Sequence, residues 1–136
     1  QFKPETKWGG MAYIIDEEMV PLLAEKTDNV YIWCWASTFV EHYDLKGFSS
    51  GMFISEVGEA MYCANDKSNS LDMSIKLRTT TQDEVDESNY GFCNIIGNYI
   101  NENTNVIYDN VMKEYGWIAE NNTVATYNHN RIKKFL

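Results

Sequence analysis

The sequence predicts an α+β fold, in which helices at both ends of the chain pack on a small antiparallel sheet at about residues 51–78. Apolar residues follow helical spacing near both ends, whereas the middle shows two-residue alternation between turn-forming segments. The 136 residues are 44% hydrophobic and carry no Pro/Gly/Ser-rich linker. This size and composition suit one ordinary folded domain. We therefore expect a single domain over residues 1–136.

Two helices are expected before the sheet. Residues 16–23 begin with three acids, which the helix dipole favours in a first turn, and Pro21 should limit this helix to about two turns. Residues 30–43 carry apolar side chains at spacings of three and four, although Tyr31–Trp35 is also a good strand sequence. The length of the pattern favours a buried helix.

Three strands are expected in the centre. Residues 52–57 and 59–64 are short apolar segments separated by Gly58, as in an antiparallel hairpin. Residues 71–78 alternate apolar and polar side chains with a period of two, which predicts a half-buried third strand.

Two further helices are expected after the sheet. Thr81 and Glu84 form a capping-box sequence ahead of a broad apolar face that runs to about Ile100. A second apolar stripe predicts a helix over about 104–119. A polar break at Asn121 and Asn122 then precedes a basic tail over residues 131–136.

The charge balance is strongly acidic, with 20 Asp and Glu against 11 Lys and Arg and a net charge of −9. Such a balance disfavours direct nucleic-acid binding and favours a protein target with a basic surface. The candidate binding residues lie in two clusters, Asp16, Glu17 and Glu18, and Asp83, Asp86 and Glu87. The same acids also suit a plain role at helix starts, as a solvated face, and both roles can coexist.

Cys34 is the one candidate nucleophile with a recognisable context. It lies near the start of the helix predicted over residues 30–43, in Trp33-Cys34-Trp35-Ala36, as the nucleophile of a papain-like hydrolase does, and His129 is the only distant imidazole that fits as its base. His129 lies in a polar stretch that lacks the strand expected around such a base. We therefore expect Cys34 to be a buried structural residue between two core tryptophans.

No cofactor or metal site is expected. Cys34, Cys63 and Cys93 are dispersed, which is typical of reduced thiols in a cytoplasmic protein and does not fit structural zinc. His42 has acidic neighbours but no further ligand at suitable spacing, and no phosphate-binding loop sequence occurs. The absence of a run of 18 apolar residues predicts no membrane span.

From Val30 onward the chain resembles the ArdB/KlcA antirestriction family. Residues 30–33 are similar to the Val-Phe-Ala-Trp of that family, and residues 86–91 to its Ser-Ala-Asp-Ala-Ala-Gly. Residues 56–64 resemble its hairpin, with the double glycine replaced by Gly58-Glu59-Ala60. The resemblance implies a mixed α/β domain that antagonises type I restriction without catalysis, and it supplies no binding residues to transfer.

Together these features predict a non-enzymatic acidic inhibitor, from a phage or plasmid, that binds a host defence nuclease or restriction complex. A toxin-neutralising immunity protein is an alternative within the same binding class. A minimal papain-like cysteine hydrolase that uses Cys34 and His129 is the competing enzymatic interpretation.

Overall fold

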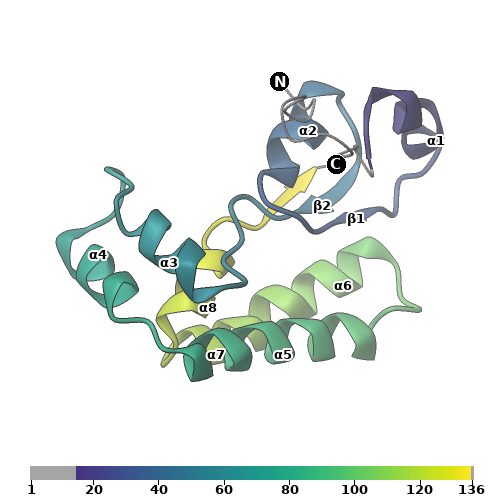
Figure 1. Ribbon diagram of the computed structural model, residues 1–136. Coiled ribbons are helices and arrows are strands. Elements are labelled where there is room, and N and C mark those ends of the chain that lie inside the picture. Colours follow the sequence, from purple (N-terminus) through teal and green to yellow (C-terminus); the bar gives the residue numbers. More distant parts are fainter. Residues whose placement is uncertain (1–14, 136) are drawn as a thin grey trace.

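The computed structural model describes residues 15–135 and has the predicted α+β composition (Figure 1). Most of the chain is helical, and one small sheet contains three strands, β1 (Val30–Tyr31), β2 (Gly47–Ser49) and β3 (Lys133–Phe135). β2 is the central strand, parallel to β1 and antiparallel to β3. The sheet therefore joins segments from both ends of the described chain, and its position at residues 51–78 was predicted wrongly.

The predicted hairpin over residues 52–64 is absent, and a helix, α3 (Val57–Cys63), lies there instead. Glu59 Oε2 accepts hydrogen bonds from the backbone N–H groups of Ser55 and Glu56, at 2.7 and 3.2 Å, and so caps the first turn. Ala60 and Cys63 are three positions apart and both are buried, so the apolar pattern serves a helix face.

The predicted strand over residues 71–78 is also a helix, α4 (Leu71–Arg78). The Ser70 hydroxyl caps it by accepting from the N–H of Met73 at 3.1 Å, and Lys76 pairs with Asp72 at 2.9 Å. Residues that alternate with a period of two also recur every four positions. Met73 and Leu77 therefore share one helix face, and only that face packs on the core.

The first predicted helix is confirmed. A 3₁₀ turn, η2 (Glu17–Met19), leads into α1 (Val20–Ala24), and the Asp16 side chain accepts from the N–H of Glu18. We predicted that the second helix begins at residue 30, but α2 (Ala36–His42) begins six residues later. Residues 30–31 form β1 instead, and the Ser50 hydroxyl holds the following turn through both backbone groups of Trp33.

Both predicted C-terminal helices are confirmed. Thr81 caps α5 (Gln82–Asn98) by accepting from the N–H of Glu84. The second helix runs through α6 (Thr104–Asn110), a π-helical segment η3 (Val111–Tyr115) and α7 (Gly116–Ala119). A further helix, α8 (Thr123–His129), was missed; the Asn122 side chain caps it, within the predicted polar break.

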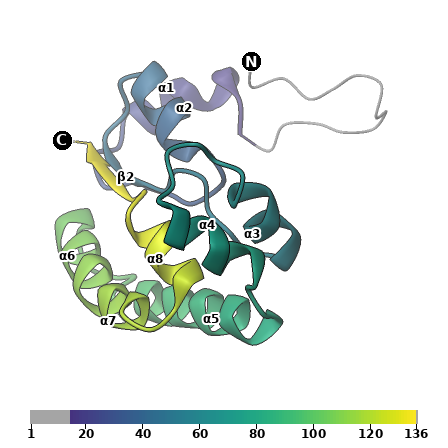
Figure 2. The ribbon, with the colours of Figure 1, turned by 90° about the vertical axis from the view of Figure 1, so that its left-hand side faces the viewer.

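The elements pack around three hydrophobic clusters. α2 and α6 both contact β2, and they lie on opposite sides of the sheet (Figure 1). α8 packs between α4 on one side and α5 and α7 on the other (Figure 2). One cluster joins the sheet to α5, η3 and α8 through Phe48, Phe92, Tyr115 and Ala125. A second unites α3, α4 and α8, and a third surrounds α2.

None of the helices within residues 15–135 combines the length and the apolar character that crossing a bilayer requires.

Candidate functional site

The structure separates the two acidic clusters. Glu17 and Glu18 are exposed on η2 beside α1, whereas Asp83 and Asp86 are exposed at the start of α5. Both ribbon views place η2 and α1 far from this end of α5 (Figures 1 and 2). Asp16 is partly buried and acts as a helix cap. The predicted acids therefore do not form one continuous docking surface.

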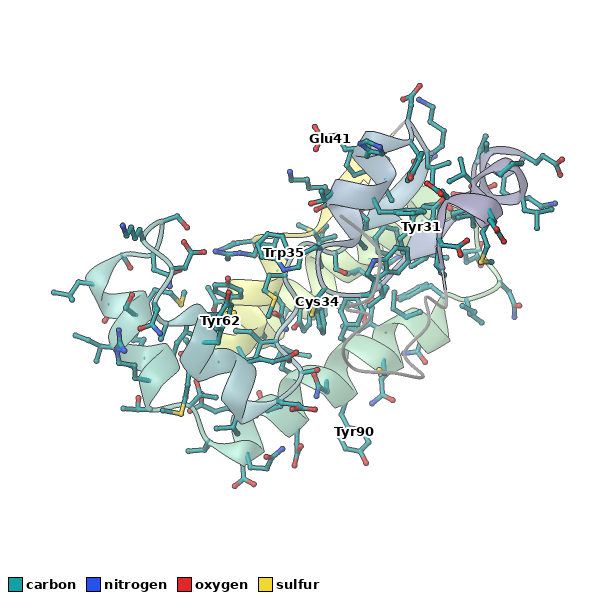
Figure 3. The ribbon with its side chains drawn as sticks, turned by 45° about the horizontal axis from the view of Figure 1, so that its top comes forward. Tyr31, Cys34, Trp35, Glu41, Tyr62 and Tyr90 are labelled. Atoms are coloured by element: carbon teal, nitrogen blue, oxygen red, sulfur yellow. The ribbon has the colours of Figure 1, made fainter. Side chains whose placement is uncertain are left out.

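The first half of α5 presents a more specific surface. Asp86 and Glu87 are adjacent, and each lies three or four positions from Asp83 and from Tyr90. All four residues are exposed, whereas Val85 packs into the core on the other side. Tyr90 is 73% exposed, and its side chain points away from the body of the protein (Figure 3). We call these four exposed residues the acidic α5 face. Tyr90 was not among the predicted binding residues, although its spacing of four from Asp86 places it on the acidic side of the helix.

Cys34 lines an open cavity of about 620 Å³ between the loop that precedes α2 and the second half of α5. Most of the wall is apolar, and includes Trp33, Phe53 and Phe92. Asn89 and Cys93 contribute the α5 side of the wall. The cavity has the apolar lining with a few polar groups that is typical of small-molecule or side-chain binding sites.

The surroundings of Cys34 do not activate its thiol. The Sγ atom lies 3.3 Å from the carbonyl oxygen of Phe53 and 3.9 Å from Oε1 of Glu59. Burial is the main cause that raises the pKa of Cys34, and the Glu59 carboxylate raises it further, whereas the contact with the Phe53 backbone opposes them. Reactive cysteines instead have electropositive neighbours that lower the thiol pKa.

The prediction that Cys34 lies buried between two core tryptophans was wrong. Cys34 is half-buried, and Trp35 is 56% exposed with a left-handed backbone at φ 65°. A tight turn imposes this conformation, because the N–H of Trp35 donates to Gly51 and that of Ala36 donates to Trp33. Trp33 alone packs inward, with its ring edge-on to Phe39.

His129 lies at the end of α8 and has a structural environment. Its Nε2 atom donates to the carbonyl oxygen of Met112 at 2.8 Å, and its ring packs near Tyr115. Within residues 15–135, no hydrogen bond links His129 to Cys34. The structure therefore does not bring the two residues of the hydrolase interpretation together as a catalytic pair.

A smaller cavity of about 270 Å³ lies beside Trp35 and was not predicted. Tyr62 of α3 and Tyr127 of α8 line it together with Trp35. The Arg131 guanidinium covers the Tyr127 ring at 3.4 Å from its centroid and lies 3.8 Å from Asp66. This arginine occupies one face of the aromatic wall.

The described part of the chain contains no group of three or more His, Cys, Asp or Glu side chains arranged to hold a metal ion. His42 is exposed and packs edge-on against Tyr43, with ring centroids 4.6 Å apart.

No protein-family model, curated protein or solved structure matches this chain. The resemblance to the ArdB/KlcA family stays a prediction. Its hairpin segment, residues 56–64, forms the helix α3 and gives that resemblance no support.

Proposed function

We propose that this chain is a non-enzymatic inhibitor that binds a protein with a basic surface through the acidic α5 face. The observation that carries the proposal is the exposure of Asp83, Asp86 and Glu87 beside the protruding ring of Tyr90. Carboxylates of this kind steer a basic partner during encounter, and exposed tyrosines are frequent anchors of binding energy at interfaces. The net charge of −9 adds to the same long-range attraction.

The target class follows from the same chemistry. Enzymes that handle DNA carry basic surfaces that match the phosphate backbone, so an acidic protein can occupy such a site. We therefore propose a cytoplasmic host defence nuclease or restriction complex as the partner. A basic toxin is the alternative target, in which case the chain would serve as an immunity protein.

The proposal is tested by the plating of unmodified phage on a host that carries a type I restriction system and expresses the chain. The charge-reversal variant Asp86→Lys/Glu87→Lys alters the acidic α5 face, and both side chains are exposed. Glu84 stays unchanged because it lies in the capped first turn of α5 and is only partly exposed. The matched control is Glu17→Lys/Glu18→Lys, which makes the same charge change on η2 at the other end of the molecule.

We expect the wild-type chain and the η2 variant to raise plating, and the α5 variant to lose that effect. Loss of about 1.4 kcal/mol of binding free energy already lowers affinity about tenfold. Equal loss in both variants would mean that only total charge matters. Absence of any effect from the wild-type chain would exclude this restriction target and favour the toxin alternative.

A second candidate function is a papain-like cysteine hydrolase. It is favoured by the position of Cys34, which lines a cavity two residues before α2. It requires a base near the thiol, whereas His129 donates to Met112 and the Glu59 carboxylate lies 3.9 Å from the Cys34 thiol. The variant Cys34→Ser separates the two functions, because the binding proposal predicts full activity in the plating assay and the hydrolase candidate predicts none.

A further inference from the structure

A third cavity, of about 310 Å³, lies where the sheet meets the start of α6. Lys46 and Gly47 come from the β2 side, Lys134 from β3, and Thr104 from α6. Figure 1 shows α6 directly below the sheet at this junction. The cavity is separate from the acidic α5 face, so its role does not depend on the function proposed above.

The charge of this cavity is opposite to that of the whole chain. Lys46 and Lys134 provide two positive charges, and Asp28 provides one negative charge. Asp28 is engaged, since its Oδ1 atom accepts from the N–H of Thr104 at 3.2 Å. The cavity therefore carries more positive than negative side chains, although the whole chain has a net charge of −9.

The two lysines retain donors for a ligand. Lys46 Nζ lies 3.4 Å from Asp44, whose side chain is almost fully exposed. Exposed ion pairs of this kind contribute little to stability, so this contact does not commit Lys46. Lys134 Nζ lies 5.3 Å from the centroid of the Tyr108 ring, a contact that uses none of its three N–H donors in an ion pair.

Thr104 supplies an independent observation. The residue is only 5% exposed, and its Oγ1 atom has no hydrogen-bond partner within residues 15–135. A buried hydroxyl without a partner is costly, so native proteins rarely leave one unless a ligand or water satisfies it. Here the unpartnered hydroxyl belongs to a residue that lines the lysine-bearing cavity.

We propose that this cavity binds a phosphate group, held by the ammonium groups of Lys46 and Lys134 and by the hydroxyl of Thr104. Lysine ammonium groups are strong point-charge partners for phosphate oxygens, and a hydroxyl adds a directed donor. The volume of about 310 Å³ leaves space for part of the molecule that carries the phosphate. Free phosphate and the phosphate of a nucleotide share this chemistry.

The test is a titration of the whole chain, followed by the amide NMR signals of residues 104 and 105 at constant ionic strength. Inorganic phosphate and a nucleoside monophosphate are the two probes, and chloride is the salt control. We expect saturable shifts with phosphate and none with chloride. Tighter binding of the nucleotide would identify a carrier that contacts the remaining cavity wall, and equal affinity would identify free phosphate.

Two sets of variants assign the site. Lys46→Gln/Lys134→Gln should weaken phosphate binding at least about tenfold, because both charges are lost. Lys113→Gln is the control for the loss of a positive charge outside the cavity, since Lys113 lies over the Trp117 ring and does not line the cavity. Thr104→Val keeps the side-chain shape, so it should raise the melting temperature of the free protein while weakening phosphate binding.

The proposal is overturned if phosphate causes no saturable shift, or if the double lysine variant binds as tightly as the wild type. It is also overturned if Lys113→Gln weakens binding as much as the cavity variant does, because only the net charge would then matter. If the Thr104→Val variant is destabilised and binds phosphate normally, the Thr104 hydroxyl is not part of the phosphate site. The melting temperature of each lysine variant separates a lost site from a lost fold.

Discussion

Gly47 shows how one residue fixes the centre of the sheet. Its φ is +127°, a backbone conformation that L side chains rarely adopt. A Cβ atom built at this position would also collide with the backbone of Asn29, which precedes β1 and receives a hydrogen bond from the N–H of Phe48. Glycine at this position therefore allows β1 and β2 to approach.

Replacing Gly47 with alanine is expected to destabilise the fold by at least about 2 kcal/mol, because the new side chain meets both backbone strain and a steric clash. The measurement is the free energy of unfolding in urea. Gly97→Ala in α5 is the matched control, since a Cβ there meets no atom within 4 Å, and it should stabilise by about 0.5–1 kcal/mol. Equal stabilities of the two variants would contradict this account of β2.

The thiols provide a test of the Cys34 environment. Cys93 is exposed, whereas Cys34 is half-buried with a raised pKa. A raised pKa means a smaller thiolate fraction at neutral pH, and only the thiolate reacts with iodoacetamide. We expect Cys93 to be alkylated first, and the Cys34 rate to keep increasing with pH above the ordinary thiol range of about 8.5. Mass spectrometry of peptides at several pH values measures both rates, and faster alkylation of Cys34 at pH 7 would indicate an activated nucleophile.

At the scale of elements, short apolar patterns did not distinguish helix from strand. The segments 57–63 and 71–78 each carry apolar residues that suit both periods, and their caps decided the outcome. Glu59 and Ser70 are the capping residues, and both signals are present in the sequence. By contrast, α5 was predicted correctly because 17 residues of helical periodicity follow one clear Thr cap.

The strands were missed for a different reason. β1 and β3 contain two and three residues, and their pairing with β2 joins positions far apart in the sequence. Segments this short carry no periodicity of their own. Hydrogen bonds from a distant residue, Ser50, also set the turn after β1 and the delayed start of α2. Such non-local contacts are not visible in a local sequence pattern.

α8 is held in place by Asn128, a fully buried side chain. Its Oδ1 atom accepts from the N–H of Ile54 at 2.7 Å, and its Nδ2 atom donates to the Ile54 carbonyl at 3.0 Å and to the Tyr115 hydroxyl at 3.3 Å. Ile54 itself is completely buried. Asn128 therefore satisfies backbone groups that no water can reach.

Replacing Asn128 with alanine should cost about 2–4 kcal/mol of folding free energy, because two buried backbone groups of Ile54 lose their partners. Chemical denaturation measures the loss. Asn94→Ala, on the exposed side of α5, should change stability by no more than about 0.5 kcal/mol. An Asn128→Ala variant as stable as the wild type would show that α8 is held mainly by its apolar contacts.

At the scale of the whole molecule, composition predicted the charge but not its distribution. The two acidic clusters were both identified from the sequence, yet the fold places them at opposite ends. Tyr90 and the cavity that contains Lys46, Lys134 and Thr104 were not identified. Identification of Tyr90 depends on which side of α5 is exposed, and this side is known only from the fold. The cavity was missed because it joins four segments that are distant in the sequence.

The acidic α5 face is proposed to contact the partner, and photo-crosslinking in the restricting host is the sharpest test of this contact. A photoreactive phenylalanine replaces Tyr90, which is 73% exposed, or Trp117, which is 57% exposed on α7 and serves as the control. We expect a covalent adduct with a basic protein from position 90 only, and loss of this adduct when Asp86→Lys/Glu87→Lys is added. An adduct from position 117 alone, or none from position 90 while inhibition persists, would contradict it.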